Sequence, residues 1–69
     1  MSGIVVLERG GHTWRANSFD QTECEITRDG QTILEWNEGK ITFNGTRITE
    51  QDLATSLDVL AEWKRKVLK

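Results

Sequence analysis

Apolar and polar residues alternate in several short segments between residue 3 and residue 48. Apolar or small side chains occupy every second position in four segments, residues 14–18, 24–26, 34–36 and 41–43. Between them stand polar side chains such as Arg15, Glu25 and Glu35. Because successive side chains of a strand point to opposite faces, this period predicts strands with one buried and one wet face. Such strands are typical of an antiparallel sheet.

Glycine-containing dipeptides separate these segments. They are Gly10-Gly11, Asp29-Gly30, Glu38-Gly39 and Asn44-Gly45. Glycine, asparagine and aspartate accept the positive φ angles of tight hairpin turns. No connection between the segments is long enough for a parallel crossover. The pattern predicts a four- or five-stranded antiparallel β-meander over residues 3–48, in which the Asn44-Gly45 pair could close a last small hairpin that returns through Ile48.

The last part of the chain, residues 49–69, has the signals of one helix. Thr49 is suited to cap its N-terminus, and acidic Glu50 and Asp52 follow in the first turn. Basic residues gather in the last turns, where the helix dipole favours positive charge. The expected fold is therefore a single α+β domain, residues 1–69, in which this C-terminal α-helix packs on the apolar face of the meander.

The apolar arc of this helix is wider than one sheet requires. A stripe of Leu53, Ala54, Leu57, Leu60 and Ala61 is expected to face the sheet. Three further apolar residues then fall on a flank of the helix, namely Val59, Trp63 and Val67. This flank either wraps over the sheet edge or meets another chain. We expect a partner-binding surface at these three residues, in a homodimer or with another protein.

Composition narrows the setting. The chain has 69 residues and a formal net charge of -2, with three tryptophans, one cysteine and no proline. No apolar run is long enough for a secretory signal or a membrane span. A single cysteine forms no internal disulfide, which favours a reducing, cytoplasmic location. A domain this small is marginal alone, which favours dense aromatic packing or self-association.

Candidate chemistry is sparse. His12 follows a glycine pair and is expected to be an exposed loop residue, since no other histidine or cysteine stands at metal-ligand spacing. Cys24 alternates with Ile26 and is expected to be a buried, inert thiol between Glu23 and Glu25. The glutamates are expected to form a solvated strand face. We therefore expect no catalytic residue, no cofactor and no metal.

Two aromatic and basic features leave an alternative open. Trp14 and Trp36 share the register of the apolar face and are expected in the core, but on an exposed face they would form a stacking platform for bases. The basic C-terminal residues Lys64, Arg65, Lys66 and Lys69 could contact phosphates. The negative net charge makes nucleic-acid binding the second hypothesis.

The sequence thus predicts a small, non-enzymatic protein-binding module acting through the flank of its C-terminal helix. Small size, mild acidity and the lack of a catalytic constellation are typical of inhibitors or adaptors encoded by bacteria or phages. The alternative is a nucleic-acid-binding domain that uses the sheet face or the basic tail.

Overall fold

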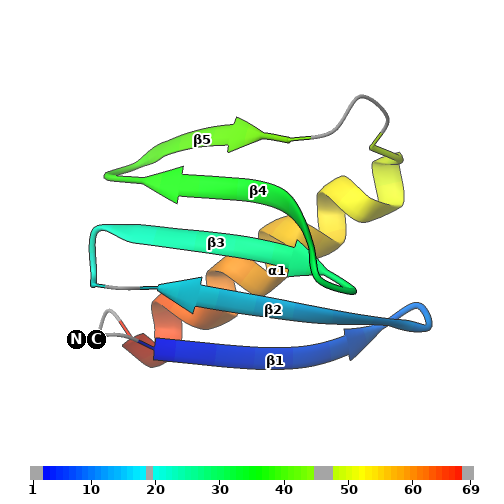
Figure 1. Ribbon diagram of the computed structural model, residues 1–69, viewed down its shortest axis with the longest axis horizontal. Helices are drawn as coiled ribbons and strands as arrows, with labels where there is room; N and C mark the ends of the chain where they lie inside the picture. The colour runs from blue at the N-terminus through cyan, green and yellow to red at the C-terminus, as the bar shows by residue number, and fades with distance from the viewer. Residues whose placement is uncertain (1–2, 19, 45–47, 68–69) are drawn as a thin grey trace.

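A computed structural model of the chain describes residues 3–18, 20–44 and 48–67. Five strands form one antiparallel sheet in the order of the sequence, and a single helix follows (Figure 1). The elements are β1 (Gly3–Arg9), β2 (His12–Ser18), β3 (Glu23–Arg28), β4 (Gln31–Asn37), β5 (Lys40–Phe43) and α1 (Glu50–Val67). The expected α+β class, meander and C-terminal helix are confirmed.

Three of the four expected glycine turns connect neighbouring strands. Both residues of each pair have positive φ, for example 50° at Asp29 and 86° at Gly30. Two consecutive positive φ angles match the twist of the flanking strands and close a two-residue hairpin. The hairpin expected at Asn44-Gly45 involves residues 45–47, which lie outside the described residues.

The register of the strands builds one apolar face. Val5, Ala16, Ile26, Leu34 and Phe43 stand in one row across all five strands. A bulge interrupts the β3–β4 ladder, because Ile26 pairs with Leu34 whereas Thr27 pairs with Thr32. The extra residue, Ile33, is 4% exposed and joins the core, although strict alternation would assign it to the polar face.

The helix begins as the sequence predicts. Thr49 accepts a hydrogen bond from the backbone N–H of Asp52 over 3.0 Å through its hydroxyl oxygen, and its carbonyl accepts one from Leu53. The hydroxyl thus satisfies one of the amide groups that the first turn leaves without an intrahelical partner, and the carbonyl accepts the first hydrogen bond of the helix itself. The expected end at residue 69 falls outside the described residues, within which α1 extends to Val67.

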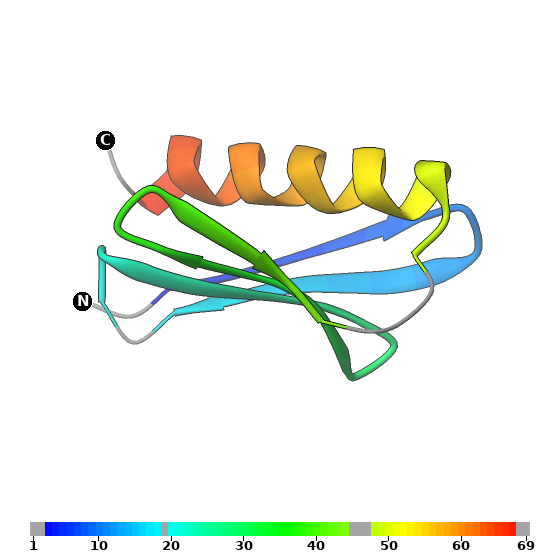
Figure 2. The same cartoon turned by 90° about the horizontal axis from the view of Figure 1, so that it is seen from above.

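One layer of helix covers only part of the sheet. Figure 2 shows α1 lying along one face, and it packs on β1, β2 and β3. The core lies between these elements, and its largest buried side chains include Trp14, Ile26, Leu34, Val59 and Trp63. Trp14 is therefore a core residue, and the stacking-platform alternative does not hold for it.

The side of the helix that faces the sheet differs from the expected stripe. Val59 and Trp63 are 0% exposed, whereas Leu53 and Leu57 are 37% and 40% exposed. Leu60 is buried as expected, and Ala54 and Ala61 are exposed. The helix is thus rotated about its axis relative to the prediction. The physical reason is that the rotation buries an entire indole, the largest apolar side chain of the helix, in place of two leucines.

Candidate interaction surface

Four exposed apolar side chains lie on the helix side of the molecule. Ile41 and Phe43 come from β5, and Leu53 and Leu57 come from α1. The register places Ile41 beside Trp36 and Phe43 beside Leu34, on the face that carries α1. These two β5 residues are 44% and 41% exposed because α1 packs on β1 to β3. We call Ile41, Phe43, Leu53 and Leu57 the α1–β5 surface.

Trp36 lies beside the β5 part of this surface, as the cross-strand partner of Ile41. It is half-buried, and its ring lies edge-on to that of Trp63 with the centroids 5.5 Å apart. Nζ of Lys64 stands 5.1 Å from the centre of the same ring, at the distance of a cation–π contact. Trp36 therefore belongs to the margin of the core and supports the helix, and a lysine covers one side of it.

The three flank residues singled out from the sequence lie elsewhere. Val59 and Trp63 are fully buried against the sheet, and Val67 is half-buried at the end of the same core. The indole N–H of Trp63 also donates a hydrogen bond to Ser18 of β2. The sequence left open whether this flank packs on its own sheet or meets another chain. The structure shows the flank packed on its own sheet. The surplus apolar arc exists, but Leu53 and Leu57 form it.

The sequence indicates that part of the apolar sheet face stays uncovered, but not which residues remain exposed. A helix is about 10–12 Å in diameter, and five strands spaced about 4.8 Å apart span roughly 19 Å. One helix therefore leaves part of a five-stranded sheet uncovered. Alternation alone assigned Ile41 and Phe43 to the apolar face and did not show that they would stay exposed.

The basic residues considered for nucleic-acid binding make different contacts within the fold. Lys64 lies over Trp36, and Arg65 forms an ion pair with Glu62 one turn earlier. Lys66 is exposed, and Lys69 lies outside the described residues. Two of the four cations are thus already engaged within the fold.

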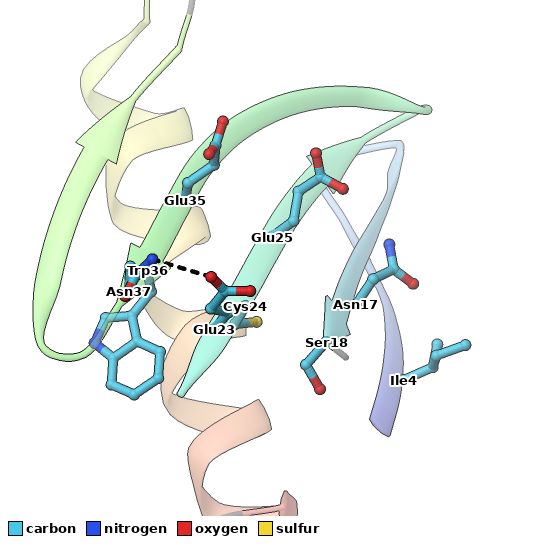
Figure 3. A pocket seen from close by; sticks show the side chains of 9 residues that line it. All are labelled: Ile4, Asn17, Ser18, Glu23, Cys24, Glu25, Glu35, Trp36 and Asn37. Atoms are coloured by element: carbon cyan, nitrogen blue, oxygen red, sulfur yellow. Dashed lines mark hydrogen bonds between the residues drawn. The ribbon is translucent and has the colours of Figure 1, made fainter. Parts of the chain in front are cut away.

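The opposite face of the sheet carries an acidic hollow of about 590 Å³ (Figure 3). Glu23, Glu25 and Glu35 line it together with polar and apolar neighbours, and Glu25 and Glu35 are direct cross-strand partners. Like charges placed opposite each other are unfavourable unless other groups compensate. The glutamates therefore need hydrogen-bond donors close by.

Each carboxylate of the hollow receives a hydrogen bond, two from strand residues and one from Asn44 just after β5. Thr32 donates to Glu25 over 2.6 Å and Asn37 donates to Glu23 over 3.1 Å, while Asn44 donates to Glu35. These bonds compensate the crowded negative charge. The hollow has the features of the solvated strand face that the sequence predicts.

Cys24 also lines this hollow, although its side chain belongs to the core. Burial, followed by the negative charge of Glu25, raises the pKa of the thiol to about 12. A neutral thiol is a poor nucleophile, because the thiolate is the reactive form. The expected burial of Cys24 is confirmed, and its low reactivity stays a prediction.

His12 is the first residue of β2 and is exposed, and its Nδ1 lies 2.6 Å from a carboxylate oxygen of Asp29. Asp29 also accepts a hydrogen bond from the backbone N–H of Thr13. These two bonds, the backbone one first, lower the pKa of Asp29 below 3.8. The pair ties two hairpin turns together.

Among residues 3–18, 20–44 and 48–67, no group of three or more histidine, cysteine, aspartate or glutamate side chains is arranged to hold a metal ion. Within the same residues, no helix combines the length and the apolar character needed to cross a membrane. No protein family model matches the chain, and no curated protein or solved structure is significantly similar to it.

Proposed function

We propose that this chain is a small, non-enzymatic protein-binding module and that the α1–β5 surface is its contact surface. The observation that carries the proposal is the exposure of four large apolar side chains from two elements on one side of a 69-residue domain. A large exposed apolar patch is typical of protein interaction sites, and these four side chains are proposed to form one. The proposal keeps the helix flank as the binding element and changes the residues that form it.

A partner bound at this surface would remove further apolar area from water. Leu53, Leu57, Ile41 and Phe43 are each between 37% and 44% exposed, so each still has area to bury. Removing apolar area from water yields about 25 cal/mol for each Å². Leu57 stands in the middle of α1. Its neighbours one turn before and one turn after on the same side of the helix are uncharged, namely Leu53 and Ala61.

Photo-crosslinking in the native host tests this proposal. A photoreactive amino acid replaces Leu57 in one variant and Asp58 in a matched control. Asp58 is the next residue of the same helix and is exposed on a different side. We expect a protein adduct from position 57 that position 58 does not give. Equal adducts from both positions, or none from position 57, would overturn the proposal.

A further inference from the structure

We infer that the occupant of the helix part of the α1–β5 surface is a second copy of this chain, with the two α1 helices packed antiparallel about a two-fold axis at Leu57. The inference rests on the proposed function and names its partner. It begins from a stripe of five exposed helix residues, Glu50, Leu53, Leu57, Ala61 and Lys64.

The stripe lies on one side of the helix. At about 100° per residue, its five members fall within an arc of about 80°. The buried residues Thr55, Ser56, Val59, Leu60 and Trp63 occupy a different arc, which faces the sheet. The spacing of three, four, four and three residues keeps the stripe nearly straight along the helix, as a helix-packing seam requires.

The stripe is symmetric about Leu57 in position and complementary in charge. Leu53 and Ala61 stand four residues before and after Leu57, and Glu50 and Lys64 stand seven residues before and after it. In an antiparallel pair centred on Leu57, each Leu53 meets the partner's Ala61. Each Glu50 then meets the partner's Lys64, so two ion pairs flank an apolar centre.

The charged ends of the stripe have no ion-pair partner among the described residues. Among the described residues, the ion pairs are His12 with Asp29, Arg28 with Asp52, and Arg65 with Glu62, so neither Glu50 nor Lys64 has an oppositely charged partner. The ammonium group of Lys64 has three donors, so it can meet a carboxylate while it stays over Trp36.

Shape and dipoles favour the same arrangement. Ala61 is small and lets a leucine of the second helix approach closely, while Leu57 meets its own copy at the axis. Antiparallel helices place the positive N-terminus of one beside the negative C-terminus of the other. A parallel pair would instead bring Glu50 to Glu50 and Lys64 to Lys64. The charge pattern therefore selects the antiparallel dimer over the parallel one.

Sedimentation equilibrium of the purified chain is the first test. We expect a monomer–dimer equilibrium with a dissociation constant between roughly 10 μM and 1 mM, as suits a small interface. Leu57→Asp brings two carboxylates together at the axis and is expected to weaken association at least about 100-fold. Ile4→Asp is the matched control, because Ile4 is 63% exposed on the other face of the sheet. Far-ultraviolet dichroism verifies that both variants stay folded.

Charge reversal tests the orientation. Glu50→Lys alone and Lys64→Glu alone each place like charges at both ends of the dimer, so each variant is expected to associate about tenfold more weakly than wild type. An equimolar mixture of the two restores both ion pairs and is expected to form the heterodimer with near wild-type affinity. Added salt should reduce the difference between the mixture and the separate variants.

The outcomes separate this inference from the proposed function. A wild-type chain that is monomeric at about 1 mM overturns the second-copy inference. The inference is also overturned if Leu57→Asp dimerises as strongly as Ile4→Asp, or if the mixture associates no more strongly than each charge-reversal variant alone. If position 57 then crosslinks to a different polypeptide in the host, the proposed function stands without the dimer. If position 57 gives no adduct, both fail.

Discussion

The indole N–H of Trp63 donates a hydrogen bond to the hydroxyl oxygen of Ser18 over 3.1 Å, and this bond joins the last turns of α1 to the end of β2. The ring itself is 0% exposed and lies against Trp36. A buried tryptophan with a hydrogen-bonded N–H fixes both the position and the rotation of a helix, because the ring and its donor must be satisfied together. This rotation leaves Leu53 and Leu57 on the free side.

Two leucines three residues apart are expected to differ in their effect on stability. Leu60 is 3% exposed, and its replacement by alanine should lower the free energy of unfolding by about 2 to 5 kcal/mol. Leu57 is 40% exposed, so Leu57→Ala should cost less than about 1 kcal/mol. Urea unfolding at low micromolar chain concentration measures both without association. Equal losses would contradict the rotation of the helix.

The two fully buried tryptophans are expected to respond differently to phenylalanine. Trp63→Phe loses packing and the hydrogen bond to Ser18, whereas Nε1 of Trp14 is buried without a hydrogen-bond partner among the described residues. Trp14→Phe therefore removes an unsatisfied donor along with its packing. We expect Trp14→Phe to cost less than Trp63→Phe by about 1 kcal/mol or more in chemical unfolding. A greater loss for Trp14→Phe would contradict this prediction.

Asp29 is expected to contribute to the acid limb of the stability profile. Its folded-state pKa lies below 3.8, so its stabilising effect is present above that value and is lost as the pH falls through the lowered pKa. Asp29→Asn keeps a side chain that tolerates the positive φ of the turn but removes the charge beside His12. The difference in stability between wild type and Asp29→Asn should shrink on acidification below pH 3.8, as thermal unfolding across pH would show. A difference that does not change would rule out this contribution.

The thiol of Cys24 is expected to be unreactive in the folded protein. Its pKa of about 12 leaves almost no thiolate at pH 8, and its side chain is buried. A thiol-specific reagent should label the chain at pH 8 only as fast as it unfolds, and denaturant should restore ordinary reactivity. A short peptide with a free thiol serves as the reference. Labelling of the native chain at the rate of that peptide would contradict the burial.

Local pattern determined the elements of this protein. Alternation at residues 14–18 and 24–26, with Asp29-Gly30 between strands, predicts hairpins because side-chain period and positive φ are properties of a few neighbouring residues. Thr49 predicts the start of α1 for the same reason. The bulge at Ile33 escaped prediction, because it arises from the pairing of two strands. The adjacent apolar residues Ile33 and Leu34 interrupt the alternation, but they do not show by themselves that both face the core.

Tertiary packing decided which residues remain for a partner. The sequence shows that the helix carries more apolar residues than one sheet needs, and that a single helix is too narrow for five strands. It does not fix the rotation of α1 or the strands on which it rests. Those follow from burying Trp63 between the helix and β2 while Arg28 of β3 pairs with Asp52 of α1, and both interactions join segments more than 20 residues apart. The rotation that allows both interactions buries Val59 and exposes Leu57, because these two residues lie on different sides of α1 and only one side can rest on the sheet.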